Sequence, residues 1–266
     1  MSYLFDTHCH LDFEDFDADR AEVLERAAQA GIRTIMIPGV SRKQSQREQV
    51  HHHEVLLLYG FGLHPYFIDQ HCAGDLDWIG EQLDAHPGAP VGEIGLDATC
   101  ADYKLQQKLF RDQVQFAADF QRPLILHHRN SQADLLEIIR SMRDQLPALA
   151  GVLHAFSGSA EQAQQWQELG FKLGVGGTIT YERASKTRDA IARSKLNGLV
   201  LETDAPDMPV CGHQGQRNEP LRLLEVRKSL LGLRSESENE VDAALWEGSQ
   251  EVFAGAFASA ERSGRR

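Results

Sequence analysis

The chain has 266 residues, of which 42% are hydrophobic and 25% are charged, a balance typical of globular proteins. Its 27 basic and 39 acidic residues give a formal net charge of −12, which argues against sequence-independent coating of DNA, because such binding needs clustered Lys and Arg. A polyanionic substrate is not excluded, since bound divalent metals can reverse the field inside a cleft.

The expected cellular compartment and the redox state of the cysteines rest on sequence patterns that are not found. No apolar run reaches the length of a membrane span, and no signal-peptide pattern precedes Asp6. The cysteines form no Cys-x-x-Cys pair; they are Cys9, Cys72, Cys100 and Cys211. We therefore expect a cytoplasmic protein with reduced thiols, no membrane association and no obligate protein partner. Strand alternation predicts that Cys9 packs in the core rather than binding metal.

Short apolar segments recur along the chain, with starts roughly 20 to 35 residues apart, the spacing of βα units. The predicted strands are Tyr3–Asp6, Thr34–Ile37, Val55–Tyr59, Val91–Ile94, Leu124–Leu126, Gly151–Leu153, Phe171–Val175 and Leu199–Leu201. Eight such units without a long linker predict an α/β fold, a single TIM-type (β/α)8 barrel of parallel strands over residues 1–266. A doubly wound open sheet is the structural alternative.

The stretches between these segments predict helices. Residues 20–30 place Ala21, Leu24, Ala27 and Ala28 on one face, and Gly31 ends that helix. Residues 105–120 and 160–169 show similar spacing. Residues 236–260 predict an extra C-terminal helix outside the barrel, and residues 263–266 are expected to be frayed.

Ionisable side chains stand at the carboxyl ends of the predicted strands. They are His8, His10, His64, Glu93, His127, His154 and Asp204. In a TIM barrel these ends converge on the catalytic face, whatever their separation in sequence. His8-x-His10 puts two imidazoles on one side of an extended strand. Histidine and carboxylate together suit a divalent cation, so the sequence predicts a metal site at this end of the barrel.

The same residues lie in motifs that resemble the TatD-type metal-dependent hydrolases of the amidohydrolase superfamily. The motifs are Asp6-Thr-His-Cys-His10, Gly62-Leu-His-Pro65, Gly92-Glu-Ile-Gly-Leu-Asp97, Pro123-Leu-Ile-Leu-His-His-Arg129, His154-Ala-Phe-Ser-Gly158 and Glu202-Thr-Asp-Ala-Pro206. The segments 174–181 and 214–218 are similar to the YjjV-like subgroup. The resemblance covers residues 4 to about 255.

The resemblance implies two divalent metal ions, Zn, Mg or Mn. By it, His8, His10, Glu93 and Asp204 hold one ion, and Glu93 bridges to a second that His127 and His154 also hold. Catalysis then falls to Glu93 and Asp204. Asp204 is either a ligand alone or a ligand that also accepts a proton from the attacking water, and we favour the second role.

Four further residues are candidates for substrate binding, each with an alternative. His64 either contacts a phosphate or leaving group, or is a structural histidine of its loop. Arg129 either binds phosphate or forms a surface ion pair. Arg217 and Asn218 either reach over the site or stabilise the loop. Asp6 and Asp97 are candidates to orient a ligand imidazole, or else form hydrogen bonds unrelated to metal.

Two departures from the family pattern could alter the substrate pocket. His128 stands where a small residue is usual, close to His127, and Ala98 follows Gly-Leu-Asp97 where the family often carries an aromatic residue. The aromatic residues show no basic interleaving along the sequence of the kind that indicates a stacking surface for single-stranded nucleic acid.

The sequence thus predicts a metal-dependent phosphodiesterase, a deoxyribonuclease acting on nucleic acid ends or small phosphodiesters. Hydrolysis of a carboxylic ester or amide, for example an aminoacyl ester, is the alternative, because the same water could attack a carbonyl carbon. A metal-binding scaffold without turnover would be marked by loss of ligands, and none is missing.

Overall fold

The computed structural model describes residues 3–47 and 50–263; most of the segment expected to fray, residues 264–266, lies outside this range. Parallel strands form its centre. They are β1 (Leu4–Asp6), β2 (Ile32–Ile37), β3 (Leu56–Tyr59), β4 (Val91–Asp97), β5 (Leu124–Arg129), β6 (Gly151–Leu153), β7 (Phe171–Val175) and β8 (Leu199–Leu201). The predicted strands and their order are confirmed.

The strands close into a barrel across two seams. Regular pairing gives one sheet in the order β1-β2-β3 and a second in the order β4-β5-β6-β7-β8. At the first seam the Gly92 N–H donates to Phe61 O at 2.8 Å. At the second, the Thr7 N–H donates to Leu201 O at 2.9 Å, and Cys9 pairs with Ala205 in a parallel bridge. These links join β3 to β4 and β8 to β1, so the fold is a TIM-type barrel and not an open doubly wound sheet.

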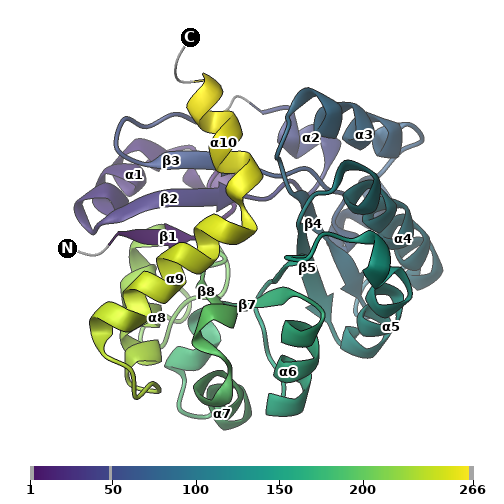
Figure 1. Ribbon diagram of the computed structural model, residues 1–266. Helices are drawn as coiled ribbons and strands as arrows, with labels where there is room; N and C mark the ends of the chain where they lie inside the picture. The colour runs from purple at the N-terminus through teal and green to yellow at the C-terminus, as the bar shows by residue number, and fades with distance from the viewer. Residues whose placement is uncertain (1–2, 48–49, 264–266) are drawn as a thin grey trace.

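Helices surround the strands (Figure 1). They are α1 (Arg20–Gln29), α2 (Arg42–Ser45), α3 (Asp75–Ala85), α4 (Tyr103–Phe120), α5 (Gln132–Met142), α6 (Ala160–Glu168), α7 (Ser185–Arg193), α8 (Leu223–Leu231), α9 (Glu238–Val252) and α10 (Ala254–Ser263). Short 3₁₀ turns complete the loops: η1 (Glu14–Phe16), η2 (Pro65–Gln70), η3 (Arg143–Gln145), η4 (Gly177–Thr180), η5 (Leu196–Gly198) and η6 (Pro220–Arg222). Ser159 and Ser237 are the N-cap residues of α6 and α9, and each takes part in a capping box.

Two strands run further than the sequence predicted. β4 and β5 continue past Ile94 and Leu126 and stay paired as far as Asp97 and Arg129. Gly95 permits this, because a Cβ there would overlap the backbone carbonyl of His127. Glu93 therefore lies within a strand rather than at its end, and its side chain is held by the barrel itself.

Two helix predictions need correction. On α1 the buried residues are Val23, Leu24, Ala27 and Ala28; Ala21, which we assigned to the buried face, is exposed. The predicted single helix over residues 236–260 is two helices. The backbone leaves helical geometry at Phe253 (φ −107°, ψ 22°), and α10 begins at the next residue.

The side chain of Phe253, at the break between α9 and α10, fills one end of the barrel. Phe253 is fully buried in a cluster with inward-facing strand residues; the cluster is Phe5, Met36, Leu58, Ile125, Val152, Val200, Val252, Phe253 and Ala256. The Phe5 and Phe253 rings lie 5.8 Å apart. Cys9 is fully buried in the larger cluster between strands and helices, as expected of a packing cysteine.

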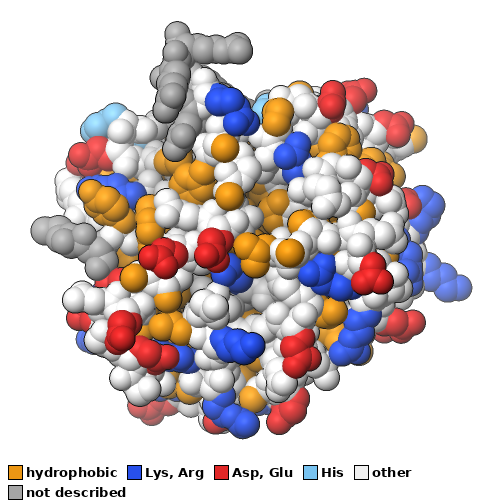
Figure 2. Space-filling view, in the orientation of Figure 1, with side chains coloured by type: hydrophobic (Ala, Val, Ile, Leu, Met, Phe, Trp, Pro, Cys, Tyr) orange, Lys and Arg blue, Asp and Glu red, His pale blue; other side chains and the backbone are white. Residues whose placement is uncertain are grey.

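The face crossed by α9 and α10 carries acidic and basic side chains intermixed, with no single basic surface (Figure 2). Among the described residues, no helix is long and apolar enough to cross a membrane.

We expect Phe253→Ala to lower the free energy of unfolding by about 3–5 kcal/mol, because it opens a cavity in a fully buried cluster. Urea unfolding followed by circular dichroism measures the change. Leu224→Ala on α8, where the side chain is 37% exposed, is the control and should cost less than about 1 kcal/mol. Equal effects of the two substitutions would contradict the role given to Phe253.

Candidate metal centre

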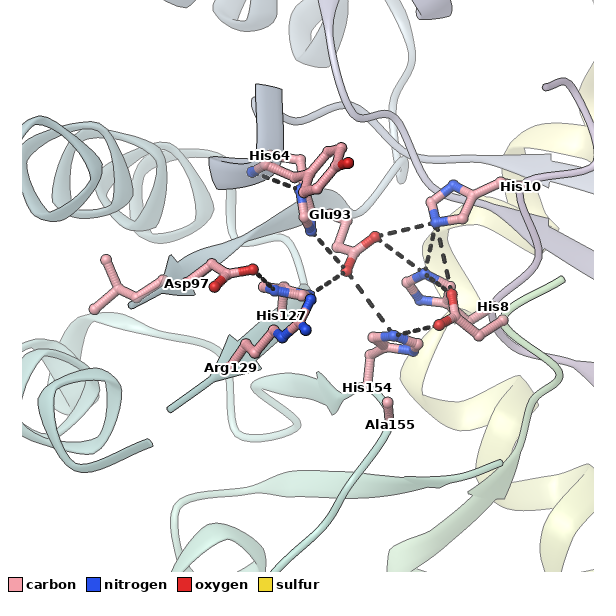
Figure 3. A network of polar contacts seen from close by, with 12 residues as sticks. His8, His10, His64, Glu93, Asp97, His127, Arg129, His154 and Ala155 are labelled. Atoms are coloured by element: carbon pink, nitrogen blue, oxygen red, sulfur yellow. Dashed lines mark hydrogen bonds and ion pairs between the residues drawn. The ribbon is translucent and has the colours of Figure 1, made fainter. Parts of the chain in front are cut away.

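The carboxylate of Glu93 lies at the centre of the opposite end of the barrel (Figure 3). Its Oε2 is 3.1 Å from His8 Nε2 and 3.3 Å from His10 Nε2. Its Oε1 is 3.2 Å from both His64 Nε2 and His127 Nδ1. Each oxygen of one carboxylate thus faces its own pair of imidazoles, from different strands and loops.

Asp204 faces the same centre from the loop after β8. Its Oδ1 is 3.7 Å from His8 Nε2 and 3.8 Å from His10 Nε2, and its Oδ2 is 3.5 Å from His154 Nε2. The residue has φ 59°, a left-handed conformation uncommon for a side chain other than glycine. Its N–H donates to His8 O at 2.9 Å, which fixes this turn against the first histidine segment.

The imidazoles of His127 and His154 are each oriented by a carboxylate on the side away from the centre. His127 Nε2 lies 3.4 Å from Asp97 Oδ2, as proposed for Asp97. His154 Nδ1 lies 3.0 Å from Glu202 Oε1. When the outer nitrogen carries the proton, the inner nitrogen presents its lone pair, which is the arrangement that metal-binding histidines adopt.

Glu202 was not singled out from the sequence, although it stands two residues before Asp204. It is fully buried, and its Oε1 also accepts from the Ala155 N–H at 2.6 Å. Gly174 on β7 makes room for it, because a Cβ there would overlap the Glu202 carboxylate. The glycines of this segment thus make space for a buried acid, in addition to shaping the end of the strand.

His64 differs from the other histidines of the centre. Its Nδ1 accepts from the Tyr66 N–H at 3.0 Å, so in the neutral ring the proton resides on Nε2. Burial lowers the pKa of His64 to about 4, so the ring is neutral at pH 7. Nε2–H then points at Glu93 as a donor. This nitrogen has no lone pair to offer a cation, although distance alone would group it with Glu93 and His127.

Two buried glutamines on α4 hold the loops that carry these groups. Gln113 accepts from the Leu63 N–H at 2.7 Å and donates to Leu63 O at 3.2 Å. Gln106 accepts from the Asp97 N–H at 2.9 Å and donates to Asp97 O at 3.1 Å. The sequence analysis missed both; their signal is two polar residues seven apart on the buried face of a helix.

Asp6 does not orient a ligand imidazole. Its carboxylate accepts from the Thr203 N–H at 2.9 Å, from the Thr203 hydroxyl at 2.6 Å and from the His8 N–H at 3.3 Å. The alternative interpretation is therefore correct: Asp6 ties β1 to the segment after β8. The Nδ1 atoms of His8 and His10 have no hydrogen-bond partner among the described residues.

The electrostatics of the centre depend on compensation between buried charges. Burial opposes ionisation of Glu93, but the imidazoles of His64 and His8 outweigh it and hold the pKa of this carboxyl well below its ordinary value. Burial likewise opposes protonation of His154, yet Glu202 and Asp204 hold the pKa of its imidazole well above its ordinary value. The carboxylates remain charged only because the imidazoles that face them, through hydrogen bonds as well as charge, offset the cost of burial.

Divalent cations fit this donor set. Imidazole nitrogens and carboxylate oxygens converge in two groups, and both are bounded by the two oxygens of Glu93. His8, His10 and Asp204 form the first, and His127 lies at the second oxygen with His64. His154 Nε2 lies between them, 4.0 Å from Glu93 Oε1 and 3.5 Å from Asp204 Oδ2. The arrangement is consistent with a binuclear site of borderline to hard cations, since nitrogen and oxygen are the donors present.

The centre opens into a pocket of about 660 Å³. Arg129 lines it beside His127, and among the described residues no carboxylate forms an ion pair with this guanidinium (Figure 3). The surface ion pair left open for Arg129 is not found among the described residues, and its contact with substrate stays a prediction. His128 also lines the pocket, and burial lowers the pKa of its imidazole to about 3.

Arg217 and Asn218 do not line this pocket. The Arg217 guanidinium binds Asp19 through two hydrogen bonds of 2.8 and 2.6 Å. Asn218 is buried, and its Nδ2 donates to the carbonyls of Thr203 at 2.9 Å and Asp207 at 2.8 Å. The structure thus places both side chains in the loop-stabilising role, because their polar groups are already occupied.

The sequence matches the family described as TatD related DNase over residues 5–254. The chain belongs to this family. It is therefore a metal-dependent hydrolase of the TatD family, as the order of its motifs indicated.

Relatives agree with the assignment. The chain is 42% identical over 253 residues to the uncharacterized metal-dependent hydrolase YjjV of Escherichia coli K12, covering 93% of this chain and 96% of that protein. It is 38% identical to an uncharacterized metal-dependent hydrolase of Haemophilus influenzae, covering 94% and 99%. The crystal structure of YjjV superposes with a TM-score of 0.86 at 39% identity, covering 94% of this chain and 98% of that one.

More distant relatives extend the comparison. A 3′-5′ ssDNA/RNA exonuclease, TatD of a Pantoea species, is 27% identical over 260 residues, covering 94% of this chain and 99% of that protein. The phosphotriesterase homology protein of Escherichia coli shares the fold, with a TM-score of 0.61 at 16% identity and coverage of 95% and 98%.

We expect Glu202→Gln to weaken metal binding about 10- to 100-fold at the ion that His154 would hold, because the imidazole loses the carboxylate that orients it. Metal titration monitored by calorimetry, with metal content checked by mass spectrometry, measures the loss. Glu182→Gln, at an exposed position after β7, is the control and should bind metal as the unmodified chain does. Unchanged stoichiometry and affinity in Glu202→Gln would remove Glu202 from the site.

Proposed function

We propose that the chain is a phosphodiesterase, a deoxyribonuclease that hydrolyses nucleic acid ends or short phosphodiesters. The observation that carries the proposal is the Glu93 carboxylate, which divides the imidazoles into two groups and gives each group one oxygen. When bound there, two divalent cations supply Lewis acidity to a phosphate oxygen and acidify the attacking water. His8, His10, Glu93, His127, His154 and Asp204 would hold them.

Asp204 would accept the proton of that water. Its side chain is 16% exposed, whereas that of Glu93 is 3% exposed with both oxygens occupied by imidazoles. Glu93 therefore serves to hold the two halves of the site together. Asp204 presents its carboxylate to the pocket, where water and substrate enter.

His64 acts as a hydrogen-bond donor. Because the Tyr66 N–H occupies Nδ1, the ring proton is on Nε2, which faces Glu93; with substrate bound, this N–H would be shared with a phosphate or leaving-group oxygen. A neutral imidazole is a poor source of a full proton, so its contribution is stabilisation of charge on that oxygen. Arg129 supplies the positive charge that would hold the substrate phosphate.

The name of the Pantoea relative, a 3′-5′ ssDNA/RNA exonuclease, supports phosphodiester hydrolysis at a strand end. The acidic surface also favours engagement of an end or a short chain over extended duplex contact.

The test is a hydrolysis screen on metal-stripped protein resupplied with Mg, Mn or Zn. The substrates are a small phosphodiester, end-labelled DNA and an aminoacyl ester. We expect the phosphodiesters to be hydrolysed, and Asp204→Asn to lower kcat at least about 100-fold while metal remains bound, because the proton acceptor is lost. Turnover of the aminoacyl ester alone would overturn the proposal. Full activity of Asp204→Asn at full metal occupancy would overturn the role of Asp204.

Arg129 and Arg217 form a matched pair for testing the phosphate contact. We expect Arg129→Ala to raise KM for a phosphodiester about tenfold, the loss of one charge-assisted contact. Arg217→Ala should leave KM unchanged, since that guanidinium is bound to Asp19 outside the pocket. Initial rates over a range of substrate concentrations separate KM from kcat. A larger rise in KM for Arg217→Ala would restore it as the substrate contact.

A further inference from the structure

A second cleft opens beside the active-site pocket. It has a volume of about 430 Å³ and is lined by residues that include Phe13, Val40, Lys43, Arg47 and Phe67. We name it the flanking cleft. Phe13, Val40 and Phe67 line the active-site pocket as well, so the two cavities share a wall. Both volumes lie within the range of roughly 300–1,000 Å³ found for small-molecule sites.

Aromatic rings form the boundary between the two cavities. The Phe13 ring stacks on the proposed ligand His10, with centroids 4.6 Å apart and planes 19° apart. Phe67 also lines both cavities and meets Tyr66 edge to face at 5.3 Å, and Tyr66 is 62% exposed. Phe13 precedes η1 whereas Tyr66 and Phe67 belong to η2, so these rings come together only in the folded chain.

Charged side chains of both signs line the flanking cleft: Glu14, Asp15, Asp17, Lys43 and Arg47. Asp17 is bound by Arg20 at 2.5 Å and by Arg47 at 2.6 Å, and Arg47 also lies 3.6 Å from Glu14. Lys43 is exposed and forms no ion pair within the part of the chain that the structure describes. Asp15 is also exposed and has no ion pair among the described residues. One ammonium group and one carboxylate are therefore unpaired in a cleft that Phe13 and Phe67 also line.

We infer that the flanking cleft binds the next nucleotide of a single-stranded substrate, one step along the strand from the nucleotides joined at the scissile phosphate. This inference rests on the proposed function. The base stacks on the wall of Phe13 and Phe67, and the phosphate of that nucleotide contacts Lys43. The strand must be unpaired, because the faces of a base in a duplex are covered by its neighbours. The absence of interleaved basic and aromatic residues in the sequence is thus misleading, since separate loops supply the two kinds of side chain.

The test compares kcat/KM for a dinucleoside monophosphate, which does not reach the flanking cleft, with kcat/KM for a single-stranded tetranucleotide. We expect kcat/KM to be about tenfold higher for the tetranucleotide, because one additional base stacks on the aromatic wall. Phe67→Leu, which keeps an apolar side chain but removes the ring, and Lys43→Ala should each reduce that preference to within about threefold. Phe120→Leu and Lys104→Ala, both on α4, are the matched controls and should keep it.

The outcomes separate this inference from the proposed function. Hydrolysis of both substrates with equal efficiency overturns the inference and leaves the phosphodiesterase in place. Hydrolysis of neither overturns the phosphodiesterase, and the flanking cleft with it. Retention of the preference in both Phe67→Leu and Lys43→Ala, or faster cleavage of a blunt duplex than of a single strand, also overturns the inference.

Discussion

The buried carboxylate of Glu93 is the constraint on which the functional end of this barrel depends. A carboxylate that is 3% exposed is unstable unless positive charge or hydrogen bonds surround it. His8 and His10 face one of its oxygens, and His64 and His127 face the other. These residues lie far apart in the chain, so closure of the strand ring is what brings the compensation together. Fold and site are for this reason inseparable.

The two ends of the barrel divide stability from function. At one end α9 and α10 meet at Phe253 and fill the interior with apolar side chains. At the other, the interior is filled by ionisable groups that replace apolar packing. The two ends are linked because side chains two residues apart on a strand point to the same side, here into the barrel. On β5, Ile125 lies in the apolar cluster and His127, two residues later, lies in the site. Val152 on β6 and His154, the first residue after that strand, repeat this pattern.

The sequence was sufficient for the groups whose placement follows from strand order. His127, His154 and Asp204 could be predicted because parallel strands in a closed barrel all end at the same face. The supporting groups could not. Gln106 and Gln113 look like ordinary polar residues of α4, and only the positions of Leu63 and Asp97 give them their role. Arg217 was open to two interpretations because its partner, Asp19, lies 198 residues away. The role of such a side chain depends on a partner in a distant loop, and the periodic pattern of the sequence does not reveal that partner.

The charge of the protein restricts how an anionic substrate would reach this site. A net charge of −12 repels nucleic acid at long range, but salt limits that repulsion to about 8 Å at physiological ionic strength. Within that distance, the charged groups nearest the substrate determine whether it is attracted or repelled. Arg129 lines the pocket and Lys43 the neighbouring cleft, and no carboxylate among the described residues pairs with either. On the proposed function, attraction would therefore begin only when a strand end enters the mouth, and a chain lying across the mixed charges of the outer surface would gain little. The acidic composition, which argued against sequence-independent coating of DNA, would then favour substrates presented end-on.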